Sequence, residues 1–325
     1  MNRKKQCWLA VVLFGCASFA AGAEPAPYDS PNPLPEPALF APGVVSTGDY
    51  ETHPAFTPDG KTIYFLKNTP TFSFWTIVES HFSGGQWSTP EVALFSGQYS
   101  DADPFITADG SKLFFISNRP LKAGDKAKDD LDIWVMEKMA NGWGEPKNLG
   151  TTVNSAENEW YPTVAADGTL YFGSGRPGGR GRTDLYRARY VNGAYQQPEN
   201  LGAPINTQFQ EYEPFISPDQ SFLIFMAASP KDPGDLFITY NRNGSWTEPK
   251  NLGQKINSPG TEYSPKISPD GKYFFFSSTK AAIGDQPFPR RQSYKELVEK
   301  LRSPGNGLGD IYQVDLSAVG IEHAR

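Results

Sequence analysis

The chain has 325 residues, of which 38% are hydrophobic and 14% aromatic, and a formal net charge of −6. An acidic chain does not attract nucleic acid or an anionic lipid surface through bulk electrostatics, so neither is a predicted partner. Both cysteines, Cys7 and Cys16, lie in the first 16 residues, which leaves no thiol elsewhere for a disulfide, a zinc site or a nucleophile.

Residues 1–23 are predicted to be a signal peptide. Three basic residues at 3–5 precede an apolar run at 8–19 that is too short to span a bilayer. Small residues then offer a cleavage site before Glu24, and losing three positive charges would change the net charge from −6 to −9. A partial lipobox ending at Cys16 is the alternative, and membrane attachment is expected only through lipidation there. We therefore expect a periplasmic or secreted protein.

Residues 24–36 contain five prolines and predict an extended tether. A repeat region at 37–320 follows, and residues 321–325 form a short tail.

An acidic residue followed three places later by proline recurs five times, and the prolines are spaced by 50, 58, 52 and 51 residues. The pairs are Glu51/Pro54, Asp101/Pro104, Glu159/Pro162, Glu211/Pro214 and Glu262/Pro265. An aspartate follows each proline by five residues, and four of these aspartates precede glycine, which predicts a two-residue hairpin turn.

Each repeat contains apolar segments for four short strands. The second strand is aromatic, the third begins with aspartate in four repeats, and the fourth starts at an aromatic residue three places before a proline. Proline suits an outer edge strand, because such a strand leaves some N–H groups unpaired. Four strands at a period near 50 predict an all-β fold, a β-propeller of five four-stranded blades. Six blades are the alternative, but they require a repeat that the sequence does not show.

The fifth repeat ends with only three strands, near residue 316. Residues 36–40 resemble the outer strands of the other repeats. We predict that this N-terminal strand completes the last blade and closes the ring, which would cover an exposed sheet edge.

Several repeat motifs resemble those of the TolB-like periplasmic propellers, a WD-like repeat family with a Ser-Pro-Asp-Gly hairpin. They are Ser-Pro-Asp at 217–219, Ser-Pro-Asp-Gly at 268–271, Ser-Asn-Arg-Pro at 117–120 and the segment 143–150. The resemblance covers residues 37–316. It implies periplasmic residence and suggests protein-associated or envelope-associated binding. TolB carries an additional N-terminal domain that has no counterpart here, so the role of TolB with its partners is not implied.

The candidate site lies at the propeller end that carries the longer insertions. The five repeated acids, Glu51, Asp101, Glu159, Glu211 and Glu262, are expected at equivalent positions around the central channel. Their neighbours His53, Asp103, Trp160, Tyr212, Glu213 and Tyr263 complete the candidate binding set. Such a ring could bind a cation, a basic peptide or a sugar. The alternative is structural, with each carboxylate accepting hydrogen bonds from the backbone of the adjacent blade.

Three insertions are expected at the same end. Residues 121–131 form a mixed-charge loop whose aspartates do not match the spacing of a known calcium loop. Arg176 lies in a glycine-arginine loop at 175–183, where it could hold an anion or pair with an acid such as Asp184. A capping box at Ser293 predicts a short helix that packs on the propeller and partly covers the channel, as a structural cap or as a partner-binding lid.

No sequence motif demands an enzyme. The three histidines are far apart, and there is no nucleophile elbow, Walker loop or dinucleotide fingerprint, so we predict neither a metal nor a cofactor. We favour a non-catalytic module that binds an envelope protein or peptide, or a glycan. The alternative is a glycosidase-like enzyme that uses two carboxylates at the channel mouth.

Overall fold

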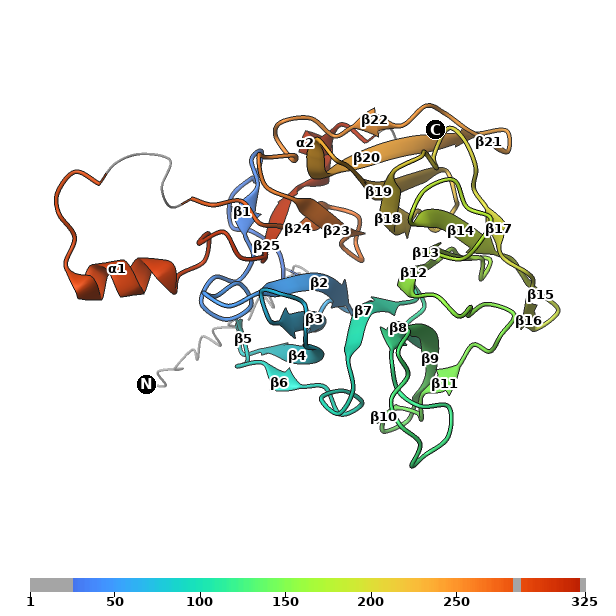
Figure 1. Cartoon of the computed structure of the whole chain (residues 1–325). Coiled ribbons are helices and arrows are strands. Elements are labelled where there is room, and N and C mark those ends of the chain that lie inside the picture. The colour runs from blue at the N-terminus through green and yellow to red at the C-terminus, as the bar shows by residue number, and fades with distance from the viewer. Residues whose placement is uncertain (1–25, 283–287, 322–325) are drawn as a thin grey trace, which may run out of the picture.

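The computed structural model describes residues 26–282 and 288–321, and within these ranges the chain forms five sheets arranged as a ring around a central axis (Figure 1). This confirms the predicted five-bladed propeller. The predicted signal peptide and Cys16 lie outside the described residues. Within the described part, no helix is long and apolar enough to cross a bilayer.

The blades follow one another along the chain. The first contains β2 (Glu51–Phe56), β3 (Thr62–Asn68), β4 (Trp75–Ser83), β5 (Gln86–Trp87) and β6 (Glu91–Val92). The second contains β7 (Asp101–Ile106), β8 (Lys112–Ser117), β9 (Asp132–Met139), β10 (Gly142–Trp143) and β11 (Lys147–Asn148). The third contains β12 (Glu159–Val164), β13 (Leu170–Ser174), β14 (Asp184–Ala188) and β17 (Glu199–Asn200), with a separate hairpin of β15 (Tyr190–Val191) and β16 (Ala194–Tyr195).

The fourth blade contains β18 (Gln210–Ile216), β19 (Phe222–Ser229), β20 (Asp232–Arg242), β21 (Ser245–Trp246) and β22 (Lys250–Asn251). The fifth contains β23 (Glu262–Ile267), β24 (Tyr273–Ser278), β25 (Asp310–Asp315) and β1 (Ala38–Leu39). Each acid-x-x-Pro motif lies on the first strand of its blade, which is the innermost strand. These strands are β2, β7, β12, β18 and β23.

The strand ends differ in detail from the prediction. In the first blade the outer strand is split into β5 and β6, which both pair with β4 on either side of Pro90. The predicted two-residue turn between the first two strands is also wrong, since residues 57–61 separate β2 from β3. The turn residue Gly60 has a left-handed φ of 69°, and Gln220 takes the same conformation, at 58°, where the fourth repeat lacks glycine.

The N-terminal strand closes the ring as predicted, because β1 pairs antiparallel with β25 through Leu39 and Tyr312. Residues 26–36 belong to the segment that the sequence predicts to be an extended tether, and they lie against the propeller. Tyr28 is only 4% exposed, its ring lies 5.4 Å from that of Phe56, and its carbonyl accepts a hydrogen bond from Gln313 at 2.6 Å. This aromatic side chain inserts between the first and last blades, which keeps the proline-rich segment on the propeller.

Aromatic and aliphatic side chains of the second and third strands fill the space between neighbouring blades. Phe115, Phe172, Phe225 and Phe276 occupy matching positions of four blades, and each is almost completely buried. Helix α2 (Leu316–Val319) continues this packing after β25, with Leu316 buried.

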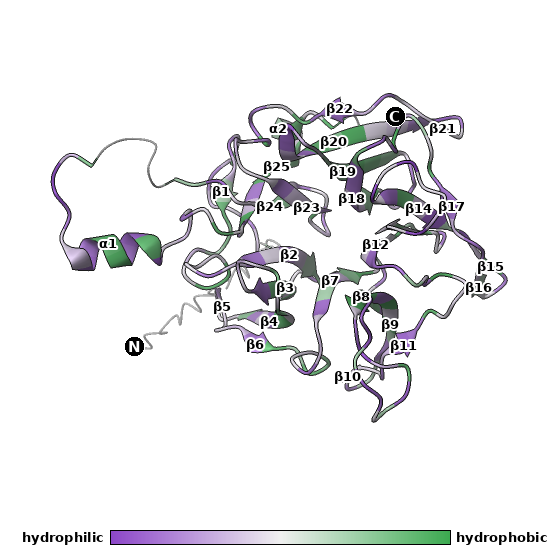
Figure 2. Cartoon of the chain, in the orientation of Figure 1, coloured by the Kyte–Doolittle hydropathy of each residue, from purple (hydrophilic) through white to green (hydrophobic). Residues whose placement is uncertain are grey.

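The predicted insertion helix forms as α1 (Tyr294–Leu301), with both hydrogen bonds of the capping box at Ser293. Its expected packing over the channel is wrong. The helix stands away from the ring (Figures 1 and 2), and none of its residues is buried. Its C-terminal end is held instead beside the first blade, where Asn306 donates to the carbonyl of Gly48 at 3.0 Å.

Because α1 buries no apolar side chain, replacing Leu297 and Leu301 by serine is expected to change the free energy of unfolding by no more than about 0.5 kcal/mol. Leu185→Ala, in a completely buried position of β14, should cost about 2–5 kcal/mol. Urea denaturation of the three chains measures both values. A large loss in the double variant would mean that α1 packs on the propeller in solution.

Candidate functional site

Every innermost strand carries an irregularity two residues after its acid. The residue there has a left-handed φ, at His53 (59°), Asp103 (55°), Tyr161 (48°), Glu213 (52°) and Ser264 (55°), and the register of each strand shifts at this point. A non-glycine residue in this conformation costs roughly 1–3 kcal/mol, so its recurrence in all five blades indicates a β-bulge built into the fold. The bulge brings side chains of different blades together at the axis.

Three of these residues form a polar cluster. The Nε2 atom of His53 lies 3.2 Å from a carboxylate oxygen of Asp103 and 3.4 Å from one of Glu213. The second oxygen of Asp103 accepts the backbone N–H of Tyr161 at 2.8 Å, and that of Glu213 accepts the backbone N–H of Ser264. The cluster therefore joins β2, β7, β12, β18 and β23.

Burial and the neighbouring opposite charges shift the pKa values of His53 and Asp103 in opposite directions. Burial raises the pKa of Asp103 to about 6, although the neighbouring His53 acts to lower it. Burial alone would lower the pKa of His53, but the charges of Glu213 and Asp103 outweigh it and hold the pKa above its ordinary value. The cluster thus places one imidazole between two carboxyl groups.

The polar cluster is the floor of a cavity of about 460 Å³, which we call the mouth cavity. Six aromatic side chains form its wall: Tyr50, Phe72, Trp75, Trp160, Tyr212 and Tyr263. Leu66, Met226, Thr261 and Thr279 fill the remaining gaps. A concave, largely apolar site with a few convergent polar groups is the usual form of a ligand pocket.

The structure separates the predicted site residues into two groups. His53, Asp103, Trp160, Tyr212, Glu213 and Tyr263 meet in the mouth cavity. The repeated acids Glu51, Asp101, Glu159, Glu211 and Glu262 do not line it, and each is fully buried. Each accepts a hydrogen bond from a serine or threonine hydroxyl four or five residues earlier, in the segment that leads from the preceding blade.

These hydrogen bonds are similar to those of the structural role that the sequence analysis gave as the alternative, in which each carboxylate accepts hydrogen bonds from the backbone of the adjacent blade. In the third blade, the hydroxyl of Ser155 donates to Glu159 at 2.6 Å. The backbone N–H of Ser155 also donates to the same carboxylate, at 3.2 Å. The acid thus fixes the entry of the chain into its blade, while the bulge two residues later positions the group at the axis.

Arg176 belongs to the same structural arrangement. Its guanidinium donates to Glu159 at 2.9 Å and to the carbonyl of Val153 at 2.7 Å, so it pairs with a nearby acid as expected, but that acid is Glu159 and not Asp184. Asp184 instead accepts the backbone N–H groups of Arg180 and Gly181. Arg176 reaches Glu159 because it follows directly on β13, the strand paired with β12.

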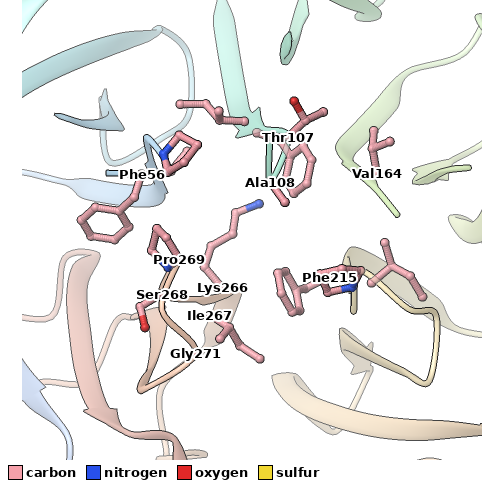
Figure 3. A pocket seen from close by; sticks show the side chains of 16 residues that line it. Phe56, Thr107, Ala108, Val164, Phe215, Lys266, Ile267, Ser268, Pro269 and Gly271 are labelled. Carbon is pink, nitrogen blue, oxygen red and sulfur yellow. The ribbon is translucent and has the colours of Figure 1, made fainter. Parts of the chain in front are cut away.

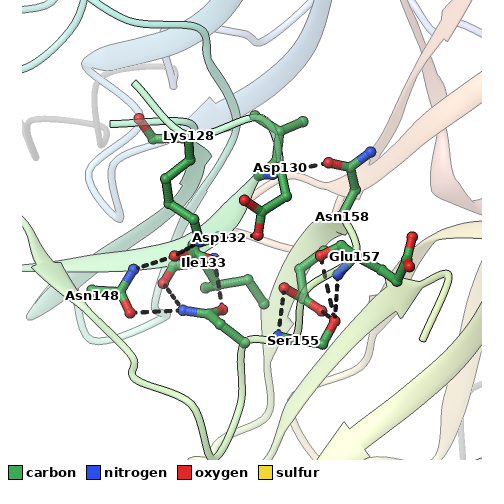
Figure 4. A network of polar contacts seen from close by, with 12 residues as sticks. Lys128, Asp130, Asp132, Ile133, Asn148, Ser155, Glu157 and Asn158 are labelled. Carbon is green, nitrogen blue, oxygen red and sulfur yellow. Dashed lines mark hydrogen bonds and ion pairs between the residues drawn. The ribbon is translucent and has the colours of Figure 1, made fainter. Parts of the chain in front are cut away.

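The mixed-charge loop after β8 is also internally paired. Lys128 forms ion pairs with Asp130, at 3.0 Å, and with Asp132, which also accepts a hydrogen bond from Asn148 (Figure 4). Across residues 26–282 and 288–321, no group of three or more histidine, cysteine, aspartate or glutamate side chains is placed to hold a metal ion.

A second cavity, of about 350 Å³, lies at the end of the channel where turns connect the first strand of each blade to the second. Figure 3 shows Lys266 among its lining residues, extended into the centre of the ring from β23. The ammonium group lies 4.3 Å from the ring centre of Tyr161 and 4.8 Å from that of Phe105, and it has no hydrogen-bond partner among the residues that the structure describes. Burial lowers the pKa of Lys266 to about 7 despite the nearby carboxylates of Asp103 and Glu213.

Sequence reasoning missed Tyr50, Phe72, Trp75, Tyr161 and Lys266. Lys266 carried a usable signal, because the equivalent positions of the other repeats hold alanine, threonine or phenylalanine. Phe72 and Trp75 lie around the connection from β3 to β4, and their place above the channel depends on the path of that loop.

The ring, the closing strand and the mouth cavity define this chain as a five-bladed β-propeller with a central aromatic pocket. Neither a protein-family model nor a curated protein matches the sequence. Solved structures do match in fold. TolB from Acinetobacter baumannii is 16% identical, with a TM-score of 0.47 over 82% of this chain and 54% of its own length.

Two further solved structures match over most of both chains. A putative TolB from Agrobacterium tumefaciens is 17% identical, with a TM-score of 0.46 over 82% of this chain and 91% of its own. An α-L-arabinofuranosidase from Lactobacillus brevis is 12% identical, with a TM-score of 0.51 over 84% and 92%. At these identities the likeness concerns the fold alone.

Proposed function

We propose that this chain is a non-catalytic binding module of the cell envelope, which holds a segment of a partner protein or peptide in the mouth cavity. The proposal rests on one observation. A wide aromatic wall surrounds a floor whose polar groups already contact one another. In the floor, Asp103 and Glu213 both contact His53 and both accept backbone N–H groups. A group that is held in this way orients a ligand more readily than it exchanges protons with one.

The wall is suited to binding because some of its aromatic side chains are buried and others are partly exposed to the cavity. Tyr50 and Tyr263 are buried, whereas Trp75, Trp160 and Tyr212 are partly exposed and line the cavity. Aromatic side chains provide a large contact area at a small cost in conformational entropy, and they often dominate binding energies.

The test is capture of partners from an envelope extract with the immobilised chain. Trp160→Ala and Tyr212→Ala should each reduce recovery of a stoichiometric partner at least tenfold, because truncating a central aromatic contact commonly costs 2 kcal/mol or more. Tyr190→Ala is the matched control, since Tyr190 lies on the β15–β16 hairpin away from the mouth cavity. Equal recovery by all variants would contradict binding at this cavity.

A glycosidase-like activity is the second candidate, favoured by one observation. The raised pKa of Asp103, at about 6, would suit a general acid, and Glu213 is a second carboxylate in the same cavity. The test is hydrolysis of aryl glycosides and oligosaccharides by the wild-type chain, Asp103→Asn and Glu213→Gln. Turnover that disappears in both variants while folding is retained would replace the binding proposal.

A further inference from the structure

We infer that the mouth cavity recognises a cation, the ammonium or guanidinium group of a lysine or arginine side chain in the bound segment. The inference rests on the proposed function, because it names the chemistry of the ligand at the same site. It is carried by the arrangement of the aromatic rings and by the charges that face the cavity.

The aromatic wall contains a continuous series of ring contacts. Ring centres are separated by 5.1 Å between Tyr50 and Phe72, 6.1 Å between Phe72 and Trp75, and 6.1 Å between Trp75 and Trp160. All three contacts are edge-to-face, so neighbouring rings present differently oriented faces around the space. Several electron-rich ring faces around one space form the kind of cage that binds organic ammonium groups.

Elsewhere in the chain, cations of the protein itself cover aromatic rings. Arg119 lies over Phe115 and Trp134, and Arg176 lies over Phe172. Within the described residues, no lysine or arginine makes such a contact with a ring of the cavity wall. The wall therefore offers its ring faces to a cation from outside.

The charges of the cavity favour the same ligand. Neither lysine nor arginine is among the residues that line it, and its floor combines the carboxylates of Asp103 and Glu213 with the single imidazole of His53. Lys266 lies behind this floor with its ammonium group sealed from solvent, and it lines the other cavity. A ligand entering from the mouth thus meets two carboxyl groups and one imidazole, in a chain whose overall charge is negative.

The size of the cavity limits the ligand to one basic side chain and the residues beside it. Its volume of about 460 Å³ lies at the lower end of the range for small-molecule sites, roughly 300–1,000 Å³. A longer partner segment would continue over the rim, where Phe72 is 42% exposed.

The experiment uses three tripeptide amides as probes: acetyl-Gly-Lys-Gly, its counterpart with an acetylated lysine, and acetyl-Gly-Glu-Gly. Binding is followed by isothermal titration and by the fluorescence of Trp75 and Trp160, with methyl glucoside as a neutral sugar probe. We expect the lysine peptide to bind at least about tenfold more tightly than the acetylated one. Its affinity should fall as salt is added.

Three variants test whether the preference for the lysine peptide arises in the mouth cavity. Trp160→Ala and Glu213→Gln should each remove the preference for lysine, whereas Glu137→Gln, which changes an exposed acid on β9, should leave it intact. Circular dichroism confirms that the variants are folded. Equal affinity for the lysine and acetylated peptides, or preference for the glucoside, would overturn the inference.

The outcomes also separate the inference from the proposed function. If both peptides bind equally and Trp160→Ala weakens both, the cavity is a peptide site that does not select cations. If neither probe binds and partner capture is insensitive to Trp160 and Tyr212, both proposals fail together.

Discussion

Replacing Arg119 by methionine is expected to lower the free energy of unfolding by about 3–5 kcal/mol, the usual cost of leaving one member of a buried ion pair without its partner. The guanidinium donates to Asp101 at 2.7 Å and to the carbonyl of Phe95 at 2.9 Å. Asp101 is fully buried, and burial already raises its pKa against the opposing charge of Arg119. Without that charge, the carboxylate must be buried unpaired or take up a proton.

An exposed ion pair provides the matched control. Arg189→Met removes the contact with Glu199 on the surface of the third blade, where both side chains are about half exposed, and should change stability by less than about 1 kcal/mol. Guanidinium chloride denaturation at neutral pH measures both variants. A loss of similar size in the two would show that Asp101 is satisfied by its hydroxyl contacts alone.

Replacing Lys266 by methionine is expected to stabilise the chain by about 1–4 kcal/mol at neutral pH, because a buried cation with no hydrogen-bond acceptor is exchanged for an apolar side chain of similar length. The carboxylates of Asp103 and Glu213 keep His53 as their partner in the variant. The rings of Tyr161 and Phe105, which now face the ammonium group, would pack against the thioether.

The dependence on pH provides a second measurement. The pKa of Lys266 falls from 10.5 to about 7 on folding, so folding releases a proton from this group between about pH 7 and pH 10.5. Above pH 10.5 this group therefore does not reduce the stability of the folded chain. As the pH falls from 10.5 toward 7, the free energy of unfolding decreases. The advantage of the methionine variant should grow over this range and then level off.

Lys147→Met, at an exposed position, should show no such trend. If Lys266→Met instead destabilised the chain, the ammonium group would be a necessary counter-charge for Asp103 and Glu213.

The blade architecture could be predicted from the sequence because its signals are local and repeated. The acid, the proline three residues later and the Asp-Gly turn mark each first hairpin, and five copies at a similar period leave few alternatives. Closure by residues 38–39 was also predictable, since that segment resembles the other outer strands. Proline content predicts an extended chain at residues 24–36, whereas the place of that chain against the propeller depends on one aromatic residue, Tyr28.

The site could be predicted only in part. The repeated acids attracted attention because they recur, but recurrence reflects a task that every blade shares, the fixing of its entry strand. The residues two places later differ between blades, and this difference makes a site of His53, Asp103 and Glu213. Their left-handed conformation could not be foreseen, since none is glycine or asparagine. The position of α1 was equally hidden, because amphipathicity predicts a helix and an apolar face but not what that face meets.

The pairing of β1 with β25 has a consequence for how this molecule folds. Residues 38–39 and 312–313 are almost the full chain apart, so this contact has one of the largest loop-closure costs in the chain. Intermediates in which four blades have assembled would still expose the edge of β25 and the groove that Tyr28 fills. We therefore expect the ring to be completed late in folding, and we expect a shorter segment before Glu36 to favour pairing of that open edge with a second molecule.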